Sequence, residues 1–441
     1  MHSVKDIQLK CNKQFIVNFD GGELSSDGGL LMLKEFLCAL GIENILKINF
    51  KTNDPASFRI HTDDQNLLQM IYQIFGTYYE DNCADELRHD PVLAAVLGKE
   101  ALASQPTISR FFNRMDDSTL RQFDDIMCQL RKKIYSLKMP EFVLFDIDTT
   151  LLATYGHQEG EGFNYHYRAH GYHPLLCYDG LTGDLIKAWL RNGTDYCSKD
   201  SAEFMEPVIA EYRKNYPDIQ LYARGDSGFA APELYDLFED NDVKYAIRLK
   251  INSTLIKLAQ DEDESLTRAT RHNMIDYAVT YGEFYYQASS WRESRMLVFK
   301  IEKPCNQMTH MYTFIVTNME LKAYQVIDYY CNRGRMENII GEGKDGFDFA
   351  SVSSKSKVVN ANRLQLHALV YNLFNWFRRF ALPKHMASHL IGTVRLKLLK
   401  VASKVVRSGR YTKFKLCSSC PYKAEVYETF KNIWQLAVQL E

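Results

Sequence analysis

The first 140 residues of the chain have apolar side chains at the spacing of amphipathic helices. Leu30, Leu33 and Leu37 recur every three or four residues after an SSDGG sequence, which is typical of a helix start. The same spacing predicts further helices over about 62–77, 81–98 and 118–137. We therefore expect a mainly helical N-terminal region.

A shorter segment over 104–115 begins with a serine and a proline and carries a polar face that includes Thr107 and Arg110. This pattern resembles a helix that reads DNA. A plain amphipathic helix with Ile108 and Phe111 in the core is an equally good interpretation. On the first interpretation, the helical N-terminal region binds DNA.

From about residue 141 the pattern changes to strands. The apolar run Phe142–Asp148 predicts a buried strand, and alternating residues within 163–190 predict two more. The pattern then predicts a helix to about Asn215, a strand Ile219–Asp226, a helix over 231–240 and a strand Lys244–Lys250. This βββαβαβ order, with acidic residues ending the first and fourth strands, is that of the α/β ribonuclease-H-like fold.

Residues 251–311 interrupt this order with a predicted β-rich insertion, which contains a hairpin with Trp291 near its turn. A strand, a helix over about 322–340 and a long helix ending before Pro383 follow. The predicted regions are 1–140, helical and DNA-binding; 141–250, the first part of the catalytic core; 251–311, the insertion; 312–382, the second part of the core; and 383–441, a basic and mainly helical C-terminal region.

Charge is unevenly distributed along the chain. From Phe349 to Ala424 there are 15 Lys or Arg and no Asp or Glu, whereas the other 365 residues carry 38 basic and 55 acidic side chains. A long acid-free basic stretch in an acidic protein indicates a polyanion partner, although a solvated basic face is the alternative. The candidate DNA contacts from this stretch are Arg378, Arg379, Lys397, Arg407 and Arg410.

The overall composition is ordinary for a globular protein, with 46% hydrophobic and 24% charged residues among 441. The sequence has no apolar run of membrane-spanning length, and its beginning lacks the apolar core of a secretory signal. Ten scattered cysteines favour reduced thiols. We expect a cytoplasmic protein that does not contact a membrane.

Two aspartates stand where chemistry is expected. Asp148 ends one predicted strand and is followed by two threonines, and Asp226 ends another within a GDSG sequence. In the predicted fold these strand ends are neighbours. Two close carboxylates repel each other unless a cation neutralises them. Mg²⁺ suits such oxygen ligands, and with a third carboxylate two metal ions can flank a phosphodiester.

The third carboxylate is predicted by a spaced set of residues. Tyr330, Arg333, Glu337 and Lys344 have the spacing Y-x2-R-x3-E-x6-K, which places them on one face of a helix. Glu337 would bind metal, Arg333 and Lys344 would bind phosphate, and Tyr330 would support them. Two glycines before Lys344 predict that the helix ends early and that this lysine acts from a loop.

This spacing, together with the DTT and GDSG sequences in the same order, resembles the YREK signature of bacterial insertion-sequence DDE transposases. The resemblance covers roughly residues 20–425. It implies a catalytic, metal-binding trio of Asp148, Asp226 and Glu337, with two Mg²⁺ ions for which Mn²⁺ can substitute. It also implies cut-and-paste cleavage of transposon ends, often through a hairpin, in a nucleoid-associated homodimer bound to terminal inverted repeats and target DNA.

Asp146 is an alternative to Asp148, because residues two apart in a strand share one face. The resemblance favours Asp148, which leaves Asp146 as a supporting or substitute ligand.

Trp291 is a candidate platform for an unstacked base, and a tryptophan covering hydrophobic surface is the other interpretation. We interpret Cys417 and Cys420 as a turn rather than half of a zinc site.

Three other functions remain open. The first is a stand-alone nuclease of the same fold, and the second is an inactive, domesticated DNA-binding protein. A glycosidase with paired carboxylates fits the basic stretch poorly.

Four histidines that are close to one another in the sequence, His157, His166, His170 and His173, could bind a metal, but a histidine-lined hairpin near DNA is the preferred interpretation.

Overall fold

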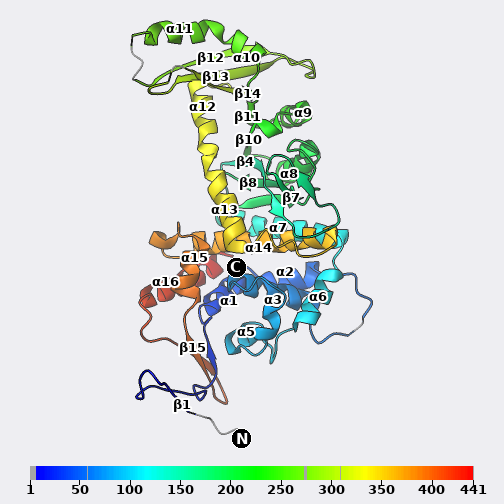
Figure 1. Cartoon of the computed structure of the whole chain (residues 1–441). Helices are drawn as coiled ribbons and strands as arrows, with labels where there is room; N and C mark the ends of the chain where they lie inside the picture. Colours follow the sequence, from blue (N-terminus) through cyan, green and yellow to red (C-terminus); the bar gives the residue numbers. More distant parts are fainter. Residues whose placement is uncertain (1–5, 57, 273–275, 308, 441) are drawn as a thin grey trace. The chain divides into compact units, whose positions relative to one another are not determined.

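The computed structural model describes residues 6–56, 58–272, 276–307 and 309–440 of the chain (Figure 1). The chain divides into two compact units. One comprises Met1–Lys138, Asp345–Asp348 and Gln365–Glu441, and the other comprises Met139–Lys344 and Phe349–Leu364. Within the described part of the chain, no helix combines the length and apolar character that a bilayer crossing requires.

The first unit is mainly helical, as predicted. Its elements before residue 138 are β1 Ile7–Gln8, β2 Ile16–Val17, β3 Leu24–Ser25, α1 Leu30–Ala39, α2 Ile42–Asn49, α3 Asp63–Phe75, α4 Cys83–Glu86, α5 Pro91–Val96, α6 Gln105–Asn113 and α7 Asp117–Leu137. One predicted helix, over 81–98, is in fact two. Asp90 breaks it, because its side chain accepts hydrogen bonds from the first turn of α5 and Pro91 follows.

The C-terminal part of this unit is less helical than predicted. It contains η3 Lys384–Met386, α15 Ile391–Val394, the π-helical turn η4 Arg395–Leu399, β15 Ser403–Arg407, β16 Thr412–Leu416 and α16 Lys423–Leu440. β15 and β16 form an antiparallel hairpin, and β15 also pairs with β3. The sequence YTKFKL over 411–416 predicts the second of these strands, whereas β15 was not predicted.

The second unit is built on one large sheet. Its first elements are β4 Phe142–Thr149, β5 Leu152–Ala153, β6 Gly162–Asn164, β7 Ala169–Tyr172, β8 Leu175–Asp179, β9 Leu185–Trp189, α8 Ser201–Asn215, β10 Gln220–Gly225, η1 Ser227–Phe229, α9 Pro232–Asp240 and β11 Lys244–Leu249. β5, β6 and β7 form a small separate sheet. β6 and β7 are the strands beyond the two expected within 163–190, and β5 precedes that range.

The order of the large sheet is β12-β13-β14-β11-β10-β4-β8-β9. β4 is central and buried on both faces: Val143, Phe145 and Ile147 lie on one face, and Leu144 and Asp146 lie on the other. β10 pairs with β4 in parallel, β11 pairs with β10 in parallel, and β8 pairs with β4 antiparallel. This is the ribonuclease-H-like arrangement predicted from the element order, and it places the ends of β4 and β10 next to each other.

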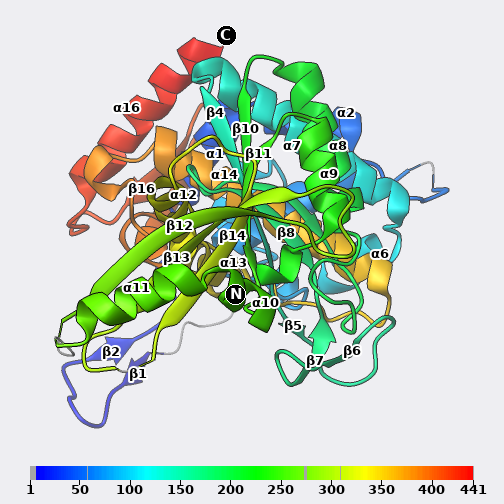
Figure 2. The same cartoon turned by 90° about the horizontal axis from the view of Figure 1, so that it is seen from above.

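The predicted insertion contains strands and helices. α10 Ser253–Leu258 and α11 Gln260–Thr270 precede β12 Ala278–Tyr286, β13 Arg295–Lys303 and β14 Met311–Thr317. The two helices were not predicted, although Asn252 caps α10 and three acidic residues occupy the first turn of α11. Figure 2 shows α11 lying along β12 and β13, which extend the core sheet beyond β14.

After β14 come α12 Ala323–Cys331, the 3-10 turn η2 Asn332–Gly334, α13 Arg335–Phe347 and α14 Lys357–Phe380. In Figure 1 α12 and α13 follow each other as one yellow run. Residues 322–340 were predicted as one helix, but Gly334 lies in a tighter turn that divides it. α12 packs on the sheet, since Val326 and Ile327 join a buried cluster with Ile315.

Candidate active site

Two carboxylates, Asp148 and Asp226, lie at the ends of the neighbouring parallel strands β4 and β10. Ile147 of β4 is opposite Gly225 of β10, so Asp148 and Asp226 are the next residues in register. Asp226 also begins η1, where its Oδ1 accepts a hydrogen bond from the Gly228 backbone at 2.8 Å. The structure thus brings together two of the three predicted metal ligands.

Asp148 is in an unfavourable setting for a negative charge. Only 16% of its side chain is exposed. Burial raises the pKa of this carboxyl, and the charges of Asp226 and Asp146 raise it further, while Arg333 and a hydrogen bond from the Thr149 backbone oppose the shift. A cation bound here would relieve the same repulsion.

Arg333 supplies positive charge to this position. Its Nη2 lies 2.9 Å from Asp148 Oδ2 and donates to the Ile147 carbonyl at 3.1 Å. The residue lies in η2, immediately after α12, and its side chain is mostly buried. The sequence predicted a phosphate ligand, and in this structure the guanidinium binds the carboxylate instead.

Tyr330 lies one turn before Arg333 and is half-buried against the cluster under α12. Burial raises the pKa of its hydroxyl, and the charge of Arg333 partly offsets that shift. The supporting role of Tyr330 stays a prediction: it would fix the end of α12 from which Arg333 extends.

Glu337 and Lys344 both lie on α13. Glu337 is in the first turn with an exposed side chain, and Lys344 is in the last turn and half-buried. The expectation that the glycines end the helix early was wrong. The helix continues to Phe347. A β-carbon at Gly343 would lie 2.8 Å from the Phe349 ring, so a glycine at this position allows the ring to pack closely against the helix.

The described residues contain no group of three or more acidic, histidine or cysteine side chains positioned to hold a metal ion. The structure therefore joins Asp148 to Asp226 but does not gather Glu337 with them. The exposed position of Glu337 in the first turn of α13 leaves its carboxylate accessible from solvent.

Asp146 has a different environment from Asp148. Its two oxygens accept hydrogen bonds from Arg224 Nε and Nη2 at 2.7 and 2.6 Å, and both side chains are almost completely buried. Arg224 Nη1 also donates to the Tyr329 carbonyl at 2.7 Å. This pair joins β4, β10 and α12, so Asp146 is committed to a structural contact.

Sequence reasoning missed two residues of this region. Arg224 precedes Asp226 by two positions, as Asp146 precedes Asp148, and this matched spacing was the available signal for the ion pair. Cys197 lies 3.6 Å from the Thr149 hydroxyl, and a β-carbon at Gly228 would come within 2.7 Å of the Cys197 β-carbon. No local pattern predicts that close approach.

Comparison with known protein families identifies the family of the chain. Residues 7–438 match the family model described as transposase DDE domain group 1. The chain belongs to this transposase family. Its function is DNA transposition, and enzymes of this class generally act with divalent metal ions.

No curated protein matches the transposase. Two of the solved structures with similarity to the chain are transposases bound to DNA. The piggyBac transposase synaptic complex with hairpin DNA has 13% identity and a TM-score of 0.39, covering 94% of this chain and 80% of that chain. The Mos1 transposase paired-end complex with left transposon end has 11% identity and a TM-score of 0.18, covering 49% and 68%.

Trp291 of the transposase is only 8% exposed. Its ring meets Tyr235 and Tyr286 edge-on, each at 5.5 Å between centroids, and the Arg295 guanidinium lies 5.6 Å from it. These contacts are those of a tryptophan that covers hydrophobic surface. A base could stack on Trp291 only after this packing had opened.

The basic C-terminal residues divide into two groups. Arg378 donates to the His389 carbonyl and lies over Phe374, Arg379 lies over Phe380, and Lys397 lies over Tyr422. Arg395 is buried and donates to the carbonyls of Phe75, Ile74 and Gly346. By contrast, Arg407 and Arg410 are exposed on the β15–β16 hairpin, where Arg407 pairs with Glu23 at 3.3 Å. The polyanion prediction therefore rests mainly on the hairpin.

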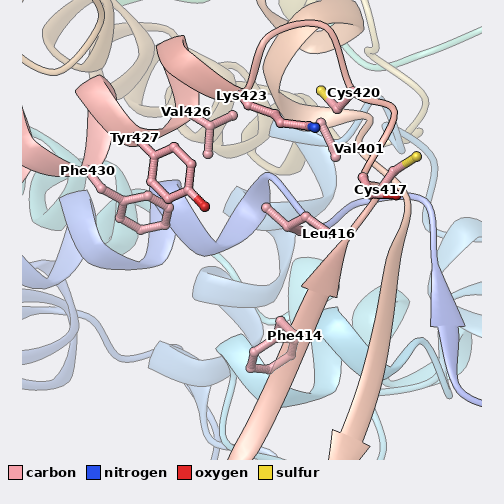
Figure 3. Close-up of a pocket in the computed structure, with 10 residues that line it drawn as sticks. Val401, Phe414, Leu416, Cys417, Cys420, Lys423, Val426, Tyr427 and Phe430 are labelled. Atoms are coloured by element: carbon pink, nitrogen blue, oxygen red, sulfur yellow. The ribbon is translucent and has the colours of Figure 1, made fainter.

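Cys417 and Cys420 form the predicted turn, since the Cys420 backbone donates to the Cys417 carbonyl at 3.2 Å. The turn borders a pocket of about 460 Å³ that is lined mainly by apolar side chains of β16 and α16 (Figure 3). Hydrogen bonds from Ser419 lower the pKa of the exposed Cys417 thiol. Both cysteines are free.

The α6 helix is confirmed, with Ile108 and Phe111 buried on its core face. At its end, Arg114 binds Asp54 at 3.0 Å and Asp63 at 3.1 Å. This arginine is therefore engaged in the fold, which leaves Arg110 as the exposed cation of the helix.

Proposed function

We propose that the transposase cleaves DNA at the ends of its element and joins those ends to target DNA, with Asp148, Asp226 and Glu337 as metal ligands. The observation that carries this proposal is the parallel register of β4 and β10, which sets Asp148 beside Asp226. The family supports the reaction, and the YREK spacing supports Glu337.

The donor atoms fit Mg²⁺, with Mn²⁺ as a substitute. Asp148 and Asp226 provide carboxylate oxygens, which are the ligands that hard divalent cations prefer. Burial raises the pKa of the Asp148 carboxyl, and a bound cation would favour its charged form. Two bound ions would make water a stronger nucleophile and stabilise the leaving oxygen of the cleaved phosphodiester.

Arg333 would change partner during the reaction. Its guanidinium holds Asp148 in this structure, and a cation at Asp148 would remove the reason for that contact. The guanidinium would then be available for a phosphate oxygen, together with Lys344 from α13. Tyr330 would keep the end of α12 in place during this exchange.

The experiment uses linear DNA that carries the element's own ends, incubated with the full-length transposase. We expect nicking at the ends with Mg²⁺ or Mn²⁺ and none after chelation with EDTA, followed by joining of the new 3′ ends to a target plasmid. Nicking that is unaffected by EDTA would contradict the metal mechanism. Nicking without joining would indicate a stand-alone nuclease.

The exposed β15–β16 hairpin is proposed to bind the DNA backbone, and two ends would require a homodimer. Replacing Arg410 and Lys413 by alanine should lower the salt dependence of DNA binding, because each lost phosphate contact reduces the slope of log K against log salt by about 0.9, or roughly 1.8 in total. Both side chains are exposed. Fluorescence anisotropy at several salt concentrations measures this slope.

The matched control is Lys431→Ala, which removes an exposed lysine from α16 outside the hairpin. It should leave the slope within about half of one contact of the wild-type value. A double variant with the wild-type slope would mean that DNA is bound elsewhere.

A further inference from the structure

The turn that carries Asp226 lies beyond the strand pairing that holds Asp148. The ladder between β4 and β10 ends at Ile147 and Gly225, and the ladder between β10 and β11 also ends at Gly225. Asp148, by contrast, is still paired with Leu176 of β8. Ligands of one metal site must be held in a narrow range of positions to bind the ion well. Contacts outside the sheet must therefore place the Asp226 turn relative to Asp148.

Cys197 contacts the chain next to both aspartates. Its Sγ lies 3.6 Å from the hydroxyl of Thr149, the residue after Asp148. On the other side, a β-carbon at Gly228 would lie 2.7 Å from the Cys197 β-carbon and 3.0 Å from its Sγ, which is too close for any side chain. The glycine thus allows Cys197 to lie directly against the backbone of the Asp226 turn.

The loop that contains Cys197 is organised around the side chain of Arg191. This residue lies two positions after β9 and is 2% exposed. Its Nε donates to the His173 carbonyl at 3.1 Å. Its Nη1 gathers three carbonyls of the loop, those of Tyr196 at 3.0 Å, Cys197 at 3.4 Å and Lys199 at 2.6 Å. The path of the chain through Cys197 is therefore fixed by one buried guanidinium.

The environment of Arg191 favours this one loop conformation. The four hydrogen bonds are all to backbone carbonyls. A buried guanidinium is costly unless its N–H groups are paired, so loop conformations that withdraw these carbonyls are disfavoured. His173 lies two residues before β8, the strand that pairs with Asp148. Arg191 thus connects the loop to the strand that holds the first aspartate.

Further hydrogen bonds close the loop on itself. The Asp195 carboxylate accepts from the Asn192 backbone at 3.1 Å and from Lys199 Nζ at 2.6 Å. The Asp195 carbonyl accepts from His173 Nδ1 at 2.7 Å. The position of Cys197 is therefore determined within the loop, and the Asp226 turn packs against a side chain that is already in place.

We propose that Arg191 is a positioning residue for the metal site: through the loop and Cys197 it sets the separation of Asp148 and Asp226. It acts through the loop carbonyls and not by binding the ion. Groups that orient metal ligands commonly change metal affinity by about 10- to 100-fold when they are removed. The proposal rests on the proposed function for the presence of a metal ion at the two aspartates.

The test measures binding of Mn²⁺ to the full-length protein in the absence of DNA, from the electron paramagnetic resonance signal of the free ion. Cys197→Ala removes the one atom that meets Thr149, and Arg191→Lys offers a single ammonium in place of a guanidinium that reaches four carbonyls. We expect each variant to raise the dissociation constant of Mn²⁺ about tenfold or more. Affinity for end DNA in EDTA should not change, because neither side chain is proposed to touch DNA.

Two further variants separate positioning from general stability. Cys197→Ser keeps a group that can hydrogen-bond with the Thr149 hydroxyl, and it should bind Mn²⁺ nearly as well as the wild type. Cys83→Ala is the matched control, because it removes the same atom from a half-buried cysteine of the first unit. It should leave the dissociation constant unchanged.

Denaturant unfolding of each variant accompanies the Mn²⁺ titration. Wild-type Mn²⁺ affinity in folded Cys197→Ala and Arg191→Lys proteins, whatever their stability, would show that the loop contributes only to the fold and would overturn the proposal. If Arg191→Lys does not fold, Cys197→Ala decides by the same criterion.

Failure of this proposal is distinguishable from failure of the proposed function. Mn²⁺ binding that is not weakened by Asp226→Asn would reject the metal site and the positioning role together. Mn²⁺ binding that requires Asp226 but is equal in wild type and loop variants would reject only the role of Arg191.

Discussion

Replacing Glu337 by glutamine is expected to slow metal-dependent nicking of the element's ends by about 10³-fold or more, which corresponds to roughly 4 kcal/mol of barrier. Glutamine keeps the size of the side chain but removes the charge that a divalent cation requires of its third ligand. Because Glu337 is exposed on α13, the substitution should leave the fold unchanged. The rate is measured by single-turnover nicking of end-labelled DNA.

Affinity for the same DNA is measured in parallel and should change little, since Glu337 is not expected to contact phosphate. Glu342→Gln is the matched control, because it lies on the same helix but points away from the face of Glu337. Nicking that persists in Glu337→Gln at the wild-type rate would refute the assignment of the third ligand.

Replacing Asp146 by alanine is expected to destabilise the second unit by about 3–5 kcal/mol, because Arg224 would be left buried without its partner. The loss would also release α12, which Arg224 holds through the Tyr329 carbonyl. Denaturant unfolding of the full chain measures the stability. Asp146→Asn retains an acceptor for Arg224 and should give a smaller loss.

Glu264→Ala is the control for this experiment. It removes an ion pair with Arg268 that is 4.0 Å long and exposed on α11, and such pairs contribute at most about 1 kcal/mol.

The Asp146→Asn protein also tests which of the two aspartates, Asp146 or Asp148, is the first metal ligand. If it folds, it should still nick DNA, whereas inactivity of the folded variant would make Asp146 rather than Asp148 the first ligand.

Much of the core followed from the sequence because its signals are local. The apolar run of β4, the strand that ends at Asp226 and the helices between them have the periodicity that burial imposes. The neighbouring positions of Asp148 and Asp226 followed from element order alone, since parallel strands bring their carboxyl ends to one edge of a sheet.

The rest depended on contacts between distant residues. The partner of Arg333 could not be predicted, because Asp148 lies far from it in the sequence and a guanidinium binds carboxylate and phosphate equally well. Burial of Trp291 depended on α9, whose Tyr235 reaches it. The number of basic residues in 349–424 that are available to bind DNA was overestimated for the same reason. Arg395, for example, is buried and donates a hydrogen bond to the Phe75 carbonyl.

The continuity of the large sheet has a mechanical consequence. β13 is hydrogen-bonded to β14 from Met296–Thr317 to Glu302–Met311, and β14 is hydrogen-bonded to β11 of the core. The β12–β13 hairpin is therefore not a hinged arm, since swinging it would break a whole ladder of backbone bonds. Any nucleotide that contacted the hairpin would therefore lie at a fixed distance from Asp226.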